Sequence, residues 1–164
     1  MITYQDGIYR TTRPLTQAST TIDANRLVLI RTEDDFGPAS VLAPQVNTHN
    51  QWSFATPGLK LRDADDLWGR SLVQLPPEGF YTLTRERVFS PSNRWPVGAL
   101  VQLGYNRQGR GILFIARRRA SLDENDLFFA SSGQGIDDEW FSYLSAVLYF
   151  DEARPAPATS PEPN

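Results

Sequence analysis

Two short apolar runs joined by a glycine-rich connector constrain this chain more than any other feature. Residues 99–103 (ALVQL) and 112–116 (ILFIA) are rich in aliphatic and aromatic side chains, and residues 104–111 (GYNRQGRG) separate them. The three glycines and the asparagine of the connector readily adopt the positive φ angles of a tight turn, so we predict a β-hairpin. Neither run alternates with polar residues, which is typical of strands covered on both faces. Other elements must therefore cover each side of this hairpin.

A second constraint is an approximate internal repeat. Residues 6–13 (DGIYRTTR) resemble residues 78–85 (EGFYTLTR), and the apolar run 27–30 (LVLI) falls opposite residues 100–103 (LVQL). Further pairs follow in the same order: 41–43 with 114–116, 52–55 with 127–130, Gly58 with Gly133, and 72–73 with 147–148. The offset runs from 72 residues (Gly7 to Gly79) to 75 residues (Phe54 to Phe129). The identities are few and a chance resemblance stays open, but the constant order favours a duplicated small domain over a solenoid array.

Each half has the same predicted order of elements: a strand, a polar loop, a hairpin, a fourth strand, a short helical turn and a closing strand. The expected strands are 7–12, 27–31, 39–43, 51–55 and 71–75, then 79–84, 99–103, 112–116, 127–130 and 146–150. Asp63 and Asp137 are the predicted N-caps of the helical turns, because short acidic side chains suit free backbone amides. This order resembles a small SH3-like barrel. We predict a mainly β protein of two sequence-related SH3-like β-barrels packed together, each with five strands and one short helical turn.

Proline-rich segments set the predicted boundaries. Pro76 and Pro77 separate an N-terminal half, residues 1–76, from a C-terminal half, residues 77–152. Residues 153–164 (ARPAPATSPEPN) contain no large apolar side chain, so we predict a disordered, proline-rich tail. Its prolines lack the PxxP spacing. We interpret the tail as a spacer, with a docking peptide as the alternative left open.

The composition excludes several kinds of site. The chain has no cysteine, which excludes thiol catalysis, disulfides and thiolate metal ligands. His49 is the only histidine and lies in a turn-like stretch, so a site with two imidazole ligands is excluded. The connector 104–111 lacks the lysine of a P-loop and leads into a strand. Four acidic clusters fall where turns and helix starts favour short acids, and none has EF-hand spacing: residues 33–35, 63–66, 123–126 and 137–139. We predict no metal and no cofactor.

Charge and hydropathy narrow the class of protein. The formal net charge is −3, which is unfavourable for a dedicated nucleic-acid binder. The first residues contain no signal peptide, and no apolar run approaches the roughly 20 residues that span a bilayer. We expect a soluble, cytoplasmic protein without a membrane partner. Lys60 is the only lysine among 16 basic residues, which indicates a GC-rich, bacterial or phage-derived coding sequence.

One predicted surface combines basic and aromatic side chains near the ends of the central hairpin. Its partner-binding candidates are Trp95, Tyr105, Arg107, Arg110, Arg117, Arg118 and Arg119. Arginine and aromatic rings together suit an acidic protein partner or a nucleic acid. A solvated strand end that pairs with nearby acids is the plainer alternative.

No stretch carries a chemical signature, so function is predicted as a class. We predict a non-enzymatic protein-interaction or assembly protein, an adaptor or structural component that binds another protein or itself. A nucleic-acid-binding accessory protein that uses the same surface is the alternative. A small hydrolase is the second alternative, and it would need the fold to bring a serine and an acid to His49.

Overall fold

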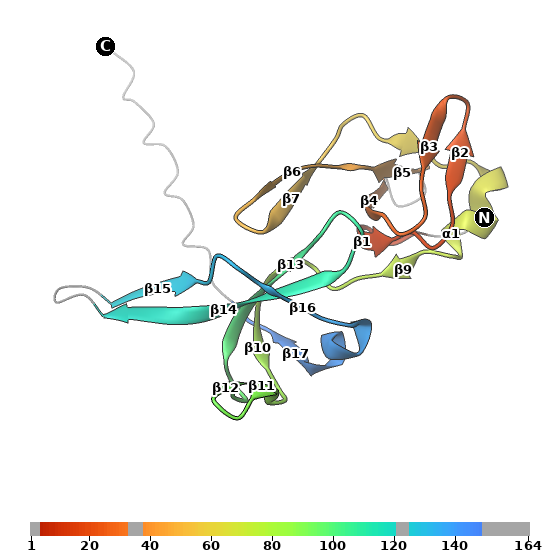
Figure 1. Ribbon diagram of the computed structural model, residues 1–164. Helices are drawn as coiled ribbons and strands as arrows, with labels where there is room; N and C mark the ends of the chain where they lie inside the picture. Colours follow the sequence, from red (N-terminus) through yellow and green to blue (C-terminus); the bar gives the residue numbers. More distant parts are fainter. Residues whose placement is uncertain (1–3, 33–37, 121–124, 149–164) are drawn as a thin grey trace, which may run out of the picture.

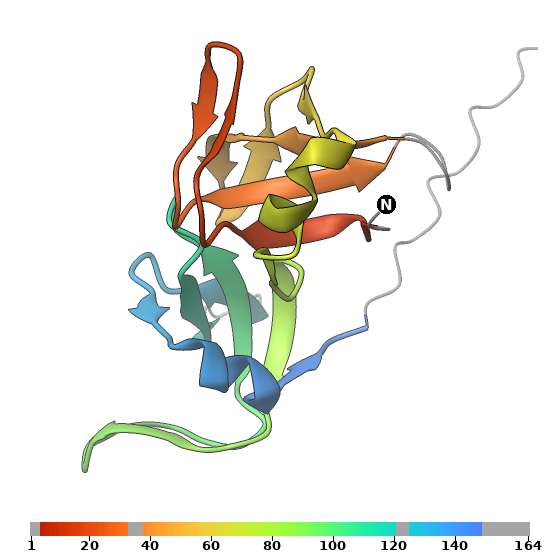
Figure 2. The same cartoon turned by 90° about the vertical axis from the view of Figure 1, so that its right-hand side faces the viewer.

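The structure of the protein is a computed structural model that describes residues 4–32, 38–120 and 125–148, with the side chains of residues 119, 120, 125 and 126 excepted. The predicted tail, 153–164, lies outside the described residues. The described chain is mainly β, as predicted. In Figures 1 and 2 the strands of the first half, red to yellow, lie against those of the second half, green to blue.

An antiparallel sheet of five strands forms the first half, in the order β8-β5-β4-β1-β9. These strands are β1 (Gly7–Arg10), β4 (Leu27–Thr32), β5 (Ala39–Leu42), β8 (Leu59–Lys60) and β9 (Val73–Gln74). Two hairpins are inserted between the sheet strands: β2 (Leu15–Gln17) with β3 (Thr20–Ile22), and β6 (Pro44–Thr48) with β7 (Gln51–Phe54). The 3-10 helix η1 (Asp63–Asp65) and the helix α1 (Asp66–Gly69) connect β8 to β9.

The second half has the same pairing pattern. Here β10 pairs with β13 and β17, β13 pairs with β14, and β14 pairs with both β15 and β16. These strands are β10 (Gly79–Leu83), β13 (Leu100–Tyr105), β14 (Gly111–Ala120), β15 (Asn125–Phe129), β16 (Gln134–Gly135) and β17 (Leu144–Ala146). The hairpin of β11 (Arg87–Ser90) and β12 (Asn93–Trp95) follows β10, and the 3-10 helix η2 (Asp138–Tyr143) precedes β17. Figure 1 shows the β14–β15 hairpin as an arm that extends beyond both sheets.

The pairing registers of the two halves correspond. Matching pairs are Gly7–Ile30 with Gly79–Leu103, Tyr9–Gln74 with Tyr81–Ala146, and Pro44–Phe54 with Ala116–Phe129. The offsets in these pairs fall within the 72 to 75 residues of the sequence repeat. The predicted alignment is shifted in two places. Val41 and Leu113 are the equivalent partners of Ile30 and Leu103, so residues 41–43 correspond to 113–115 and not to 114–116. The closing strands are shifted by three residues. Gln74 corresponds to Ala146, an offset of 72, because the chain before β17 is three residues shorter than the chain before β9.

The prediction of five strands in each half was too simple. The segment 51–55, expected as the fourth sheet strand, forms β7 and pairs with β6, while the fourth sheet strand is the two-residue β8. Two residues are too few for a recognisable sequence pattern. Asp63 is the first residue of η1 and its N-cap is Arg62, whereas Asp137 is the N-cap of η2 as predicted. Of the strand expected over 146–150, residue 146 ends β17 and residues 149–150 lie outside the described residues.

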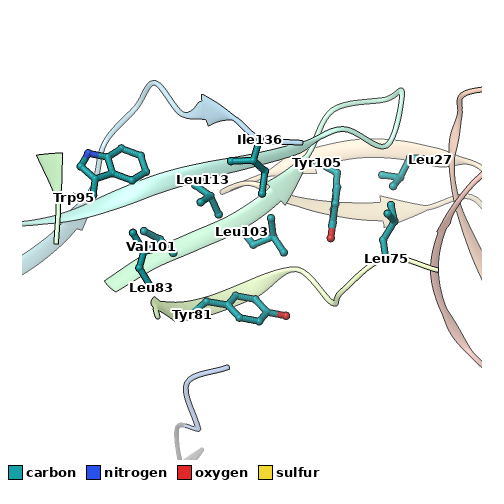
Figure 3. Close-up of a cluster of buried hydrophobic side chains, with 10 residues drawn as sticks. All are labelled: Leu27, Leu75, Tyr81, Leu83, Trp95, Val101, Leu103, Tyr105, Leu113 and Ile136. Atoms are coloured by element: carbon teal, nitrogen blue, oxygen red, sulfur yellow. The ribbon is translucent and has the colours of Figure 1, made fainter. Parts of the chain in front are cut away.

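The strand β13 is covered on both faces, as its apolar sequence predicted. Leu103 on one face is fully buried in the largest core cluster, shown in Figure 3. On the other face, the buried amide of Gln102 accepts a hydrogen bond from Asn50 Nδ2 (2.9 Å) and donates one to the carbonyl oxygen of His49 (2.7 Å). Asn50 and His49 form the turn of the β6–β7 hairpin, with positive φ at both. A hairpin of the first half therefore covers the central strand of the second.

The core crosses the boundary between the halves. Leu27 of β4 and Leu75 belong to the same buried cluster as Tyr105 and Leu113 of the second half (Figure 3). The backbone amide of Leu27 also donates to the carbonyl oxygen of Arg107 at 2.9 Å. A second cluster, around Val28, lies within the first half. The two halves thus share one of their two cores.

Two tyrosines hold the connection between the halves. The hydroxyl of Tyr105 donates to the carbonyl oxygen of Pro76, and that of Tyr81 donates to the carbonyl oxygen of Pro77, both at 2.7 Å. Glu78 follows directly, and its Oε2 accepts a hydrogen bond from the backbone amide of Trp52 at 2.9 Å. Burial raises the pKa of Glu78 against the opposing effect of hydrogen bonding to the backbone amides of Trp52 and Tyr105. Residues 76–78, which join the halves, are therefore hydrogen-bonded to both of them: to the second half through the two tyrosines and to the first half through Trp52.

Candidate interaction surface

The two aromatic rings of the predicted surface are buried. Trp95 falls in the segment predicted as the polar loop between strands 79–84 and 99–103, but it ends β12 and is 8% exposed, because it belongs to the core cluster that contains Leu83 and Val101 (Figure 3). Tyr105 is 3% exposed and lies where the first half covers the end of β13. Neither ring belongs to an exposed surface, so this part of the prediction was wrong.

One of the predicted arginines, Arg107, lies at the junction of the halves. Arg107 donates to the carbonyl oxygens of Pro44 and Gln45 (3.3 and 3.2 Å), and its guanidinium lies 5.1 Å from the centre of the Trp52 ring. Arg110 lies 4.0 Å from a carboxylate oxygen of Asp137. Arg107 therefore joins the second half to the β6–β7 hairpin of the first.

The remaining arginines lie far from these two. Arg117 and Arg118 are exposed on the β14–β15 arm, opposite Phe128 and Leu127 of β15. The backbone of Arg119 is in β14, and its side chain is outside the described part of the chain. Seven residues of extended strand, about 23 Å at 3.3 Å per residue, separate Arg117 from Arg110. The structure does not bring the predicted site residues together.

A different group of side chains forms a continuous surface between β11 and η2. We call it the Arg–aromatic row, and its members in order are Arg85, Tyr143, Trp140, Arg87 and Phe89. The Arg85 guanidinium lies 4.8 Å from the centre of the Tyr143 ring, which meets the Trp140 ring edge-to-face at 5.5 Å. The Arg87 guanidinium lies 4.5 Å from the Trp140 ring and 5.1 Å from the Phe89 ring. Cation–π contacts of this kind contribute about 0.5–2 kcal/mol each.

Local geometry explains why these side chains meet. Arg87 and Phe89 are two residues apart in β11, whose pairing with β12 is irregular between Val88 and Ser90, and the Arg87 guanidinium lies over the Phe89 ring. Trp140 and Tyr143 are three residues apart in a 3-10 helix, where residues i and i+3 lie on one side. The hairpin is also joined to β16, the strand that precedes η2, because Arg87 Nη2 donates to the carbonyl oxygen of Gly135 at 2.9 Å.

The row carries two positive charges. Arg85 is exposed and donates to the hydroxyl of Tyr143 at 2.9 Å. Arg87 is half-buried, and this burial lowers its pKa, although a guanidinium stays protonated in proteins. Its Nη1 is buried without a hydrogen-bond partner among the described residues. Within those residues neither arginine forms an ion pair with a carboxylate. The row therefore presents aromatic surface beside cations that have no ion-pair partner in that part of the chain.

The first half provides an internal comparison, because β2 and α1 hold the places in its strand order that β11 and η2 hold in the second half, 72 residues earlier. Leu15, Gln17 and Trp68 correspond to Arg87, Phe89 and Trp140, and they are only 5–8% exposed. Gln17 Nε2 donates to Asp65 Oδ2 at 2.6 Å, and the indole of Trp68 donates to the carbonyl oxygen of Arg13 at 2.9 Å. Phe89, by contrast, is 36% exposed. The hairpin and the helical turn close against each other in the first half and leave rings accessible in the second.

The sequence contained one signal that could have revealed this row. The aligned repeat places Phe89 opposite Gln17 and Arg87 opposite Leu15, which are changes of side-chain class between otherwise similar segments. The approach of η2 to β11 carried no such signal, because about 50 residues separate Phe89 from Trp140.

The only histidine and a cleft between the halves are two other possible sites. His49 is exposed in the β6–β7 turn, as predicted for a turn histidine. A cleft of about 480 Å³ lies where the halves meet, lined by side chains that include Trp52, Phe54 and Glu78, and His49 does not line it. Among the described residues, no three histidine or acidic side chains are grouped as a metal site would require.

Within the ranges that the structure describes, no helix combines the length and the apolar character needed to cross a membrane. Comparison of the chain with family models, curated proteins and solved structures found no match.

Proposed function

We propose that this protein is a non-enzymatic interaction or assembly protein that binds a protein partner through the Arg–aromatic row. The observation that carries the proposal is the contrast between the halves at equivalent positions, where a buried Gln17 corresponds to a partly exposed Phe89. A ring left exposed contributes less to folding than a buried one. Aromatic and arginine side chains are enriched among the residues that anchor protein partners.

We also propose that the two halves are SH3-like barrels that arose by duplication. The shared strand order and pairing registers support this origin. So does a repeated hydrogen bond, in which the hydroxyl of Tyr9 donates to the carbonyl oxygen of Gln5, as Tyr81 does to Pro77. In this view one copy kept a closed contact between its first hairpin and its helical turn, and the other copy turned that contact into a binding surface.

Affinity capture from native cells with the full chain tests the proposed surface. The double variant Arg87→Leu/Phe89→Gln installs the residues that the first half has at these positions, so it should fold with an unchanged circular dichroism spectrum. We expect the full chain to retain a protein that the double variant loses. The matched control is Arg117→Gln/Arg118→Gln, which removes two charges from the β14–β15 arm and should keep the partner.

Two results would refute this proposal. Equal capture by the full chain and by the Arg87→Leu/Phe89→Gln variant would show that the row is not the contact surface. Steeply salt-dependent retention on DNA or RNA, lost in the Arg117→Gln/Arg118→Gln variant, would assign the protein to nucleic-acid binding instead.

A further inference from the structure

We propose that the proline-rich segment 153–164 of the same molecule docks on the Arg–aromatic row. This inference rests on the proposed function, because it names a segment of the chain that occupies the proposed partner surface. A partner would then bind in competition with the tail, which lowers its apparent affinity by the fraction of molecules whose surface is free.

The first argument is the place where the described chain ends. η2, which carries Trp140 and Tyr143, leads directly into β17, and the last described residue is Leu148. Five residues of extended chain, about 17 Å, separate Leu148 from Tyr143. The six residues 149–154 can span up to about 20 Å. Pro155 can therefore reach the level of Tyr143 within the same molecule.

The second argument is the spacing of apolar residues in the tail. A polyproline II helix has three residues per turn, so Pro155, Ala158 and Pro161 fall on one side of it. Aromatic surfaces bind such preformed extended segments at a low entropic cost. The Arg87 guanidinium lies 4.5 Å from the centre of the Trp140 ring and 5.1 Å from that of the Phe89 ring, so the two ring centres are at most about 10 Å apart. One polyproline II turn, roughly 9 Å, is therefore long enough to contact both rings.

The third argument is charge. Residues 149–164 contain three acids, Asp151, Glu152 and Glu162, and a single base, Arg154. The row contributes Arg85 and Arg87. Asp151 and Glu152 directly precede the segment 153–164, which itself contains one acid and one base, so opposite charges steer the stretch of chain that leads into the segment toward this surface. The same charges would weaken docking as the salt concentration rises.

The four indole N–H signals in a ¹H–¹⁵N spectrum of the full chain test this proposal, since the chain has four tryptophans. Pro155→Ser/Pro161→Ser removes the apolar stripe. The matched variant Pro157→Ser/Pro163→Ser has the same composition but changes a different side of the polyproline II helix. We expect the first variant to shift the Trp140 signal to its position in a chain that ends at residue 152. The second variant should shift it by less than half as much, and Trp68 should not move in either.

Three results would overturn the docking proposal: a Trp140 signal that is the same in all chains, equal shifts in the two proline variants, or a shift that depends on protein concentration. The last result would indicate contact with another molecule. Each of these outcomes leaves the interaction surface itself to be judged by the capture experiment with Arg87→Leu/Phe89→Gln. The two proposals can therefore fail separately.

Discussion

Leu27→Ala should destabilise both halves of the protein together. Leu27 belongs to β4 of the first half, but its fully buried side chain lies in the core cluster with Tyr105 and Leu113 of the second (Figure 3). Truncating a buried leucine to alanine costs about 2–5 kcal/mol, made up of lost transfer free energy and the cavity left behind. Because the side chain is completely inaccessible and its neighbours belong to two sheets, we expect a loss of about 3 kcal/mol in the free energy of unfolding.

Urea denaturation followed by tryptophan fluorescence and by far-ultraviolet circular dichroism measures this loss. The two probes should give one coincident transition for the parent and for Leu27→Ala, with an unchanged m-value and a lower midpoint. For a chain of this size, about 3 kcal/mol corresponds to a decrease in Tm of roughly 6–12 °C. Leu67→Ala, at a position that is 74% exposed, is the matched control and should change the free energy by less than about 0.5 kcal/mol.

Two results would refute the reasoning. A loss below about 1 kcal/mol would mean that the cavity closes by moving the two sheets together, so that the junction is more adaptable than a shared core allows. Two separate transitions in the parent protein would mean that the halves unfold independently.

Three further predictions concern single positions. In Gly104→Ala the added methyl group would lie 2.8 Å from a carbonyl oxygen in the β6–β7 turn, so denaturation should show a loss of about 1–3 kcal/mol. Gly135→Ala, where nothing lies within 4 Å, should be nearly neutral. Asp65→Ala removes the acceptor of the Arg62 backbone amide (2.8 Å) and the nearer acceptor of the buried Gln17 amide (2.6 Å), which keeps only its 3.2 Å hydrogen bond to the Lys60 carbonyl oxygen. It should cost about 1–3 kcal/mol in thermal unfolding. The hydrogen bond from the Arg10 guanidinium holds the pKa of Asp138 below its usual value. The ionised carboxylate therefore stabilises the fold above about pH 4, the ordinary pKa of an aspartate. This stabilisation is lost as the pH falls through the lowered pKa. Asp138→Asn should therefore be less stable than the parent at neutral pH and approach it in acid, measured by urea unfolding between pH 2 and pH 7.

The parts of the fold that could be predicted are those with local signals. Strands β13 and β14 were recognisable because apolar runs flank a glycine-rich turn, and pairs such as Gly104 with Ile112 confirm the hairpin. The short hairpins β2–β3, β6–β7 and β11–β12 were missed, because their strands have three to five residues and few apolar side chains. Trp95 shows the consequence, since a segment interpreted as a loop is a strand with a buried ring.

The candidate site was harder to predict than the fold. Tyr105 and Arg107 were predicted to lie close together in the segment 104–111, but their surroundings come from residues more than 25 positions away. Whether an aromatic ring is exposed depends on what the fold lays over it. Comparing the two halves position by position was the only route from the sequence to Phe89, and it required an alignment with few identities.

The tyrosine hydroxyls that hold Pro76 and Pro77 have a consequence for recognition. Pro76 and Pro77 join the halves, and because each is held by a hydrogen bond to its carbonyl oxygen, the halves cannot rotate about this linker. Any large ligand that touches both would meet them at one set spacing and angle, and would gain avidity only if its own shape matches. Such a platform selects its ligands by fit and cannot adapt to them by bending.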